Sequence, residues 1–110
     1  MSELKERGMT AAKAYLERVG VDVLDDDGKH AIIALDDGVL VHVEVLVADS
    51  NRAMECARKR APSLKKRLAK LLHFAEENNM DNMIRFEEIS IHAISDDRAL
   101  LRHNKEVHND

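Results

Sequence analysis

A single carboxylate, Glu44, lies in the middle of the apolar segment Val39–Val47, where it could do chemistry or be costly to bury. His42 shares its side of a two-residue repeat, and a third ligand such as His30 or His92 would complete a transition-metal site. The histidines and the cysteine show no His-x-His or Cys-x-x-Cys spacing, so we name no metal site and expect no cofactor. Glu44 is then either a carboxylate in a repurposed pocket or a structural carboxylate paired with a base from a covering helix. The structural interpretation is favoured.

Positive charge is concentrated between Arg52 and Lys70, where eight basic residues accompany one acidic residue in a chain of net charge −4. A local cluster of this kind can bind phosphate groups whatever the average charge of the protein. It is equally typical of a solvated helix surface, and the stretch has no aromatic residue on which a base could stack. Both interpretations stay open. The candidate nucleic-acid-binding residues are Arg58, Lys59, Lys65, Lys66, Arg67 and Lys70.

The only cysteine, Cys56, cannot form an internal disulfide, which fits a reducing cytoplasm. The sequence contains no basic leader before an apolar core and no apolar run approaching about 18 residues, so we expect a cytoplasmic protein without a membrane partner. Cys56 lies beside Ala53 and Ala57, and we expect it to be a small residue on the core side of a helix.

The first half of the chain reads as one helix and three strands. Apolar residues at helical spacing predict a helix from residue 3 or 4 to Val19. Strands are expected at Val21–Asp25, Lys29–Leu35 and Val39–Val47, separated by Asp-Gly turns at 26–28 and 36–38. The last strand alternates almost without fault and has apolar residues on both sides, which indicates the centre of a sheet covered on both faces.

The second half reads as helix followed by strand. Ser50 or Asn51 can cap a first helix, and Pro62 fits a break or the first turn of a second helix. The core side of the first helix is expected to contain Ala53, Met54, Ala57 and Ala61. The second helix, Ser63–Asn78, is expected to bury Leu64, Leu68, Leu71, Leu72 and Ala75. Strands follow at Ile84–Ile94 and at Arg98–His103.

Together these elements predict one α/β domain over residues 1–103 and a polar, frayed tail at 104–110. The expected order is α-β-β-β-α-β-β, with helices covering a mixed β-sheet. A helical crossover allows the strands at 39–47 and 84–94 to run parallel.

Three segments in this order resemble the YraN-like family of uncharacterised bacterial proteins. They are AAKAYLERVGVDVL, ALDDGVLVHVEV, and KKRLAKLLHFAEENN followed by IRFEEISI. The resemblance implies a restriction-endonuclease-like (tRNA-endonuclease-like) fold. Nucleases of that fold hold Mg²⁺ with an Asp and with the Glu of a Glu-x-Lys motif, whose Lys positions the attacking water.

The resemblance also implies that this site is degenerate. Glu44 stands at the position of the motif's Glu, but Leu46 replaces the Lys and Ala31 replaces the metal-binding Asp. Met9 stands at the position of a further Glu in the first helix. One carboxylate is a poor Mg²⁺ site, and Leu46 cannot transfer a proton, so we expect a protein that is not an enzyme.

Two functions follow from these observations. The first is a catalytically inactive nuclease-fold protein that binds DNA or structured RNA non-specifically through the basic helix face. The alternative is a protein-interaction or structural module, in which acidic and basic faces drive formation of a homodimer or docking of a partner.

Overall fold

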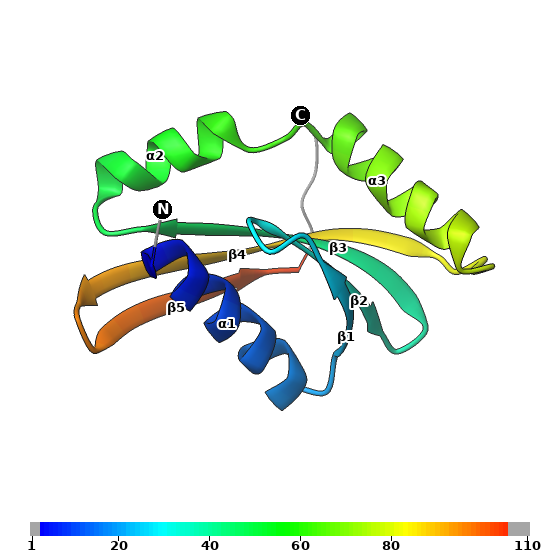
Figure 1. Cartoon of the computed structure of the whole chain (residues 1–110), viewed down its shortest axis with the longest axis horizontal. Coiled ribbons are helices and arrows are strands. Elements are labelled where there is room, and N and C mark those ends of the chain that lie inside the picture. Colours follow the sequence, from blue (N-terminus) through cyan, green and yellow to red (C-terminus); the bar gives the residue numbers. More distant parts are fainter. Residues whose placement is uncertain (1–2, 106–110) are drawn as a thin grey trace.

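The computed structural model describes residues 3–105 and forms a five-stranded mixed sheet with three helices (Figure 1). In chain order the elements are α1 (Glu3–Arg18), β1 (Asp22–Asp26), β2 (Ala31–Asp36), β3 (Val39–Ala48), α2 (Asn51–Arg60), α3 (Leu64–Glu77), β4 (Ile84–Ser95) and β5 (Arg98–Asn104). The strands lie in the order β1-β2-β3-β4-β5, and they pair antiparallel except for β3 with β4, which is parallel. The predicted α/β class and the parallel pairing are confirmed.

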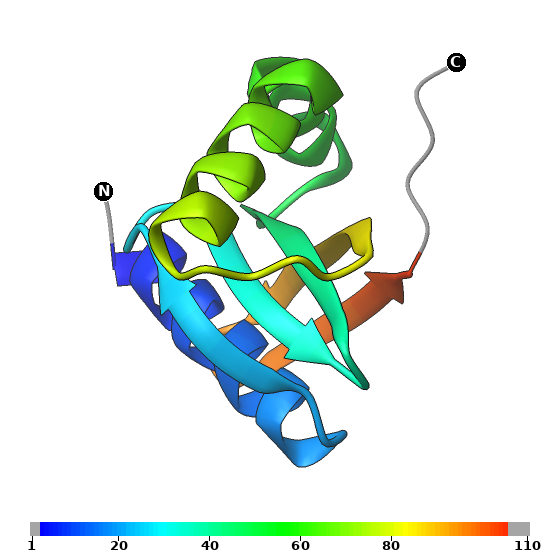
Figure 2. The same cartoon turned by 90° about the vertical axis from the view of Figure 1, so that its right-hand side faces the viewer.

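Strand β3 is the central strand, as its alternation predicts. Its valines face α1 and pack with Ala12 and Leu16 in one core cluster. Leu40, His42, Glu44 and Leu46 alternate with the valines and therefore point to the opposite face, where α2 and α3 lie. Figure 2 shows α1 on one side of the sheet and α3 on the other.

Helix α1 approaches the sheet closely because it has a glycine at the contact. A Cβ atom at Gly8 would overlap with the side chain of Val47. Met9 and Ala12 follow on the same buried side of the helix. Gly8 therefore sets the distance between α1 and the sheet.

The other face is covered by two shorter helices that meet at a junction. Ser50 caps α2 by accepting a hydrogen bond from the Ala53 N–H, and Ser63 caps α3 by accepting one from the Lys66 N–H. Pro62 lies in the break between them. Met54 anchors α2 over Leu46, while Leu71 of α3 packs with Ile33 and Leu40.

The turn at 36–38 forms the predicted hairpin. Asp36 pairs with Val39, and the two residues between them, Asp37 and Gly38, both have positive φ values of 51° and 84°. Positive φ at both central positions is the requirement of the tight two-residue turn that Asp-Gly sequences favour.

Two predicted buried residues are exposed instead. Leu72 is 50% exposed, because α3 turns Leu71, Phe74 and Ala75 toward the sheet. Cys56 is exposed as well, since α2 is anchored through Met54 and Ala57 on another side of the helix. The predicted tail begins at Asn104, which belongs to β5, and its residues 106–110 lie outside the described residues.

Candidate functional site

Glu44 lies almost completely inside the protein, 1% exposed, on the face of β3 that α2 and α3 cover. Its Oε2 atom is hydrogen-bonded to Nδ1 of His30 at 2.6 Å. Its Oε1 atom lies 3.9 Å from Nε of Arg67, which is at the outer limit of an ion pair. The expected structural carboxylate therefore has two basic neighbours. The closer one comes from the loop before β2 and only the more distant one comes from a covering helix.

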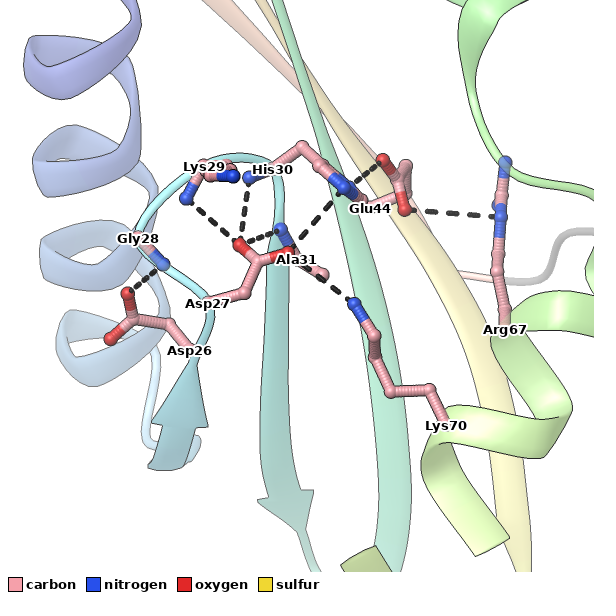
Figure 3. A network of polar contacts seen from close by, with 9 residues as sticks. All are labelled: Asp26, Asp27, Gly28, Lys29, His30, Ala31, Glu44, Arg67 and Lys70. Carbon is pink, nitrogen blue, oxygen red and sulfur yellow. Dashed lines mark hydrogen bonds and ion pairs between the residues drawn. The ribbon is translucent and has the colours of Figure 1, made fainter. Parts of the chain in front are cut away.

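The loop between β1 and β2 holds His30 in place through Asp27. The Oδ1 atom of Asp27 accepts hydrogen bonds from the backbone N–H groups of Lys29, His30 and Ala31. Its Oδ2 atom lies 3.4 Å from Nε2 of His30 and 3.3 Å from Nζ of Lys70. Figure 3 shows His30 between the carboxylates of Asp27 and Glu44.

The pKa values of the two carboxyl groups move in opposite directions. Partial burial alone would raise the pKa of Asp27, but the three backbone N–H donors and His30 hold it well below its usual range. Burial raises the pKa of Glu44, although His30 and Arg67 act against this shift. Ionisation in the folded protein is therefore less favourable for Glu44 than for Asp27.

Three buried polar atoms on this side of the sheet have no hydrogen-bond partner within residues 3–105: Oε1 of Glu44, Nη1 of Arg67 and Nδ1 of His42. Burial lowers the pKa of His42 to about 4, and the charge of Arg67 adds to the effect, so the imidazole is neutral at pH 7. Native interiors leave few such atoms unpaired, so this cluster is the least satisfied part of the described core.

A cavity of about 160 Å³, which we call the junction pocket, lies beside Glu44 where α2 ends. Its walls include His30, Leu46 and the residues that join α2 to α3. Three cationic residues also line it: Lys5, Lys29 and Arg60. Arg60 belongs to the basic stretch but was not among the candidate binding residues, and neither Lys5 nor Lys29 was predicted to take part. Lys5 and Lys29 lie far from the basic stretch in the chain, and the spacing of residues gives no sign that they approach it.

The candidate basic residues do not form one face. Arg67 is 7% exposed, and its Nε donates a hydrogen bond to the Pro62 carbonyl, so the prediction that it belongs to a solvent-facing cluster is wrong. Arg58 pairs with Glu88, and Lys70 pairs with Asp27. Lys59, Lys65 and Lys66 are exposed.

The positions that correspond to the catalytic residues of the resembled family do not all lie together in the structure. Ala31 lies directly across from Glu44 in the β2–β3 register, and Leu46 follows on the same buried face. Met9 packs in the α1 cluster on the opposite face of the sheet, so it does not share a site with Glu44. Within residues 3–105, no group of three or more His, Cys, Asp or Glu side chains is placed to hold a metal ion.

A second buried polar cluster lies under α1, and the sequence analysis did not predict it. Glu87 is 2% exposed and receives Nε2 of His103 at 2.5 Å on one oxygen and Nε of Arg85 at 2.6 Å on the other. Nη2 of Arg85 also donates a hydrogen bond of 2.6 Å to Asp36. Nδ1 of His103 is hydrogen-bonded to the Tyr15 hydroxyl at 3.0 Å. The Arg-x-Glu spacing in β4 places two opposite charges on one face, which is the signal that could have found it.

The comparisons with known proteins add no family. No protein-family model matches the chain, and no curated protein matches it in sequence. No helix among the described residues is long and apolar enough to cross a membrane.

Proposed function

We propose that this protein is a catalytically inactive, restriction-endonuclease-like protein that binds DNA or structured RNA without sequence preference. Its binding surface is the basic corner, defined as the exposed residues Lys59, Arg60, Lys65 and Lys66 around the α2–α3 junction. The fold part of the proposal is supported by the mixed sheet, with helices on both faces, and by Glu44 on its central strand. The lack of catalysis is supported by Ala31 directly opposite Glu44.

One observation carries the binding surface. The side chains of Lys59, Arg60, Lys65 and Lys66 make no hydrogen bond or ion pair with any residue in the described part of the chain. Cations that a fold leaves unpaired at one corner raise the local potential that attracts phosphate groups.

The position of two of these lysines strengthens the argument. Lys65 and Lys66 lie in the first turn of α3, which contains no acidic residue. The positive end of the helix dipole disfavours cations there and favours Asp or Glu by about 0.3–1 kcal/mol. Residues that act against local stability are expected where a surface serves binding.

The test is a polarisation titration of labelled duplex DNA and of structured RNA at several salt concentrations. The logarithm of affinity should fall linearly with the logarithm of salt, with a slope of about −2 to −4 on duplex DNA if two to four phosphates are neutralised. Neither nucleic acid should be cleaved when Mg²⁺ or Mn²⁺ is added.

The corner is tested by reversing charge in matched pairs. Lys65→Glu with Lys66→Glu should abolish binding, whereas Arg98→Glu with Lys105→Glu changes the net charge equally and should leave most of it. Equal loss in both double variants would assign binding to overall charge. If wild-type protein binds nothing at low salt, the protein-interaction module takes the place of this proposal.

A further inference from the structure

The junction pocket brings together cations that the sequence keeps apart. Lys5 belongs to α1, Lys29 to the loop between β1 and β2, and Arg60 to the last turn of α2. A solvated helix surface would not require side chains from three elements to meet around one cavity. The convergence is therefore a property of the tertiary structure and calls for an anionic occupant.

Two of these cations are available to a ligand. The side chains of Lys29 and Arg60 are exposed and form no ion pair or hydrogen bond with another residue between positions 3 and 105. The pocket is also continuous with the basic corner, because Arg60 belongs to both and Ala61 and Pro62 of the junction line its wall.

We infer that the junction pocket binds a phosphomonoester, namely the terminal phosphate of a nucleic-acid strand whose backbone lies on the basic corner. The inference rests on the proposed function for the identity of the strand. A terminal phosphate carries a charge of about −1.5 to −2 at neutral pH and three acceptor oxygens, whereas an internal phosphodiester carries a single charge and continues as chain on both sides. Lysine and arginine side chains that converge from different directions suit the terminal group.

The size of the cavity agrees with this assignment. About 160 Å³ corresponds to roughly five water molecules, which accommodates a phosphate group and its linkage but not a passing duplex. A larger hollow of about 490 Å³ over β4 and β5 also has two arginines, Arg58 and Arg102. There, Arg58 is paired with Glu88 and the acidic Glu55 lines the wall, so it offers less to an anion.

Glu44 has a defined and unusual role in this inference. Its carboxylate lies at the pocket wall and opposes an anion, and the hydrogen bond from His30 and the neighbouring Arg67 reduce that opposition. Neutralising Glu44 should therefore tighten phosphate binding. A site that used Glu44 as a ligand, for a metal or for a hydroxyl group, would instead lose binding.

The experiment compares three probes: a short duplex DNA oligonucleotide with a terminal phosphate, the same duplex ending in a hydroxyl group, and inorganic phosphate. We expect wild-type protein to bind the phosphorylated oligonucleotide about tenfold more tightly than the hydroxyl form, as the gain of one charge-assisted contact implies. Inorganic phosphate should compete with the phosphorylated form and remove its advantage.

The variants assign the preference to the pocket. Lys29→Ser and Arg60→Ser should each reduce the tenfold preference to about twofold or less, whereas Lys66→Ser should weaken both oligonucleotides equally and keep the preference. Glu44→Gln should increase the preference. Because Lys29, Arg60 and Lys66 are exposed, thermal unfolding should confirm that these variants remain folded.

The outcomes separate this inference from the proposed function. Equal binding of both oligonucleotides, or loss of the preference in Glu44→Gln, overturns the pocket and leaves nucleic-acid binding by the corner. Binding of inorganic phosphate that depends on Lys29 and Arg60, without binding of any oligonucleotide, supports the pocket and overturns the proposed function. If neither phosphate nor oligonucleotide binds, both are overturned.

Discussion

Two buried carboxylates on neighbouring strands, Glu44 of β3 and Glu87 of β4, have opposite surroundings. Both oxygens of Glu87 have short hydrogen bonds, from His103 and Arg85, and the cluster continues to Tyr15. Glu44 has one such bond, and its Oε1 atom has no hydrogen-bond partner in the described structure.

The two clusters differ in how completely their polar atoms are paired. The Glu87 cluster joins α1, the end of β2, β4 and β5, and every charge in it has a partner, as expected of a network that fixes how elements pack. The Glu44 cluster leaves polar atoms without a partner beside a cavity that the exposed cations Lys29 and Arg60 help to line.

The largest expected effect is on stability. Glu87→Ala should reduce the free energy of unfolding by about 3–5 kcal/mol, because it removes the buried partner of both Arg85 and His103, and only Arg85 keeps another acid, Asp36. Glu44→Ala removes the same side chain but only one short hydrogen bond, and it should cost about 1–2 kcal/mol. Urea unfolding of both variants measures the difference. Equal losses would remove the distinction between the two clusters.

The second prediction uses the pH dependence of the Glu44 side. His42 binds a proton in the unfolded chain below a pKa of 6.5 but in the folded protein only below about 4. Stability should therefore fall as pH decreases from 6.5 to 4, by up to about 3 kcal/mol from this group.

Unfolding measured over this range in wild type and in His42→Leu isolates the contribution. The variant should show a flatter profile. Glu44 acts in the opposite direction, since its raised pKa makes stability fall as pH rises above 4.5. Parallel profiles for wild type and His42→Leu would show that His42 titrates normally in the folded protein.

The third prediction tests the outer end of the Glu87 cluster. Tyr15→Phe removes the hydroxyl group that bonds to Nδ1 of His103 but keeps the edge-to-face contact between the two rings. It should cost about 1 kcal/mol in the free energy of unfolding. An unchanged free energy of unfolding would mean that the stabilising network ends at His103 and does not include the Tyr15 hydroxyl.

The smallest effect is expected at the basic corner. Lys65→Glu with Lys66→Glu should change the free energy of unfolding by less than about 1 kcal/mol, and in the stabilising direction, because both acids would lie at the positive end of α3. Adding Arg67→Glu should destabilise the protein strongly, since Arg67 is buried near Glu44. A destabilising effect of the first double variant would mean that the corner contributes to the fold.

Local sequence was sufficient for most of the architecture. The alternation in β3 and the Asp37–Gly38 turn depend on interactions between near neighbours in the chain, and both were predicted correctly. The sequence offered Ser50 or Asn51 as the cap of α2, and the structure shows that it is Ser50. The basic character of the stretch from Arg52 to Lys70 was also evident from composition alone.

Tertiary structure decided which residues of α3 face inward. Two sides of α3 could have faced the sheet, and both include Leu71 and Ala75. One of them also includes Leu72, and the other includes Arg67 and Phe74. Helical periodicity alone does not decide between them. The second side faces the sheet, because Arg67 can reach both the Pro62 carbonyl and the vicinity of Glu44.

The junction pocket could not be predicted from the sequence either, because it also depends on tertiary packing. Lys5, Lys29 and Arg60 meet only because α1 and the β1–β2 loop pack beside the end of α2. The sequence determined which elements form and where charge is concentrated along the chain. Packing between distant elements decided which of those charges are buried, paired or left facing a cavity, because a side chain's partners depend on contacts that local spacing does not encode.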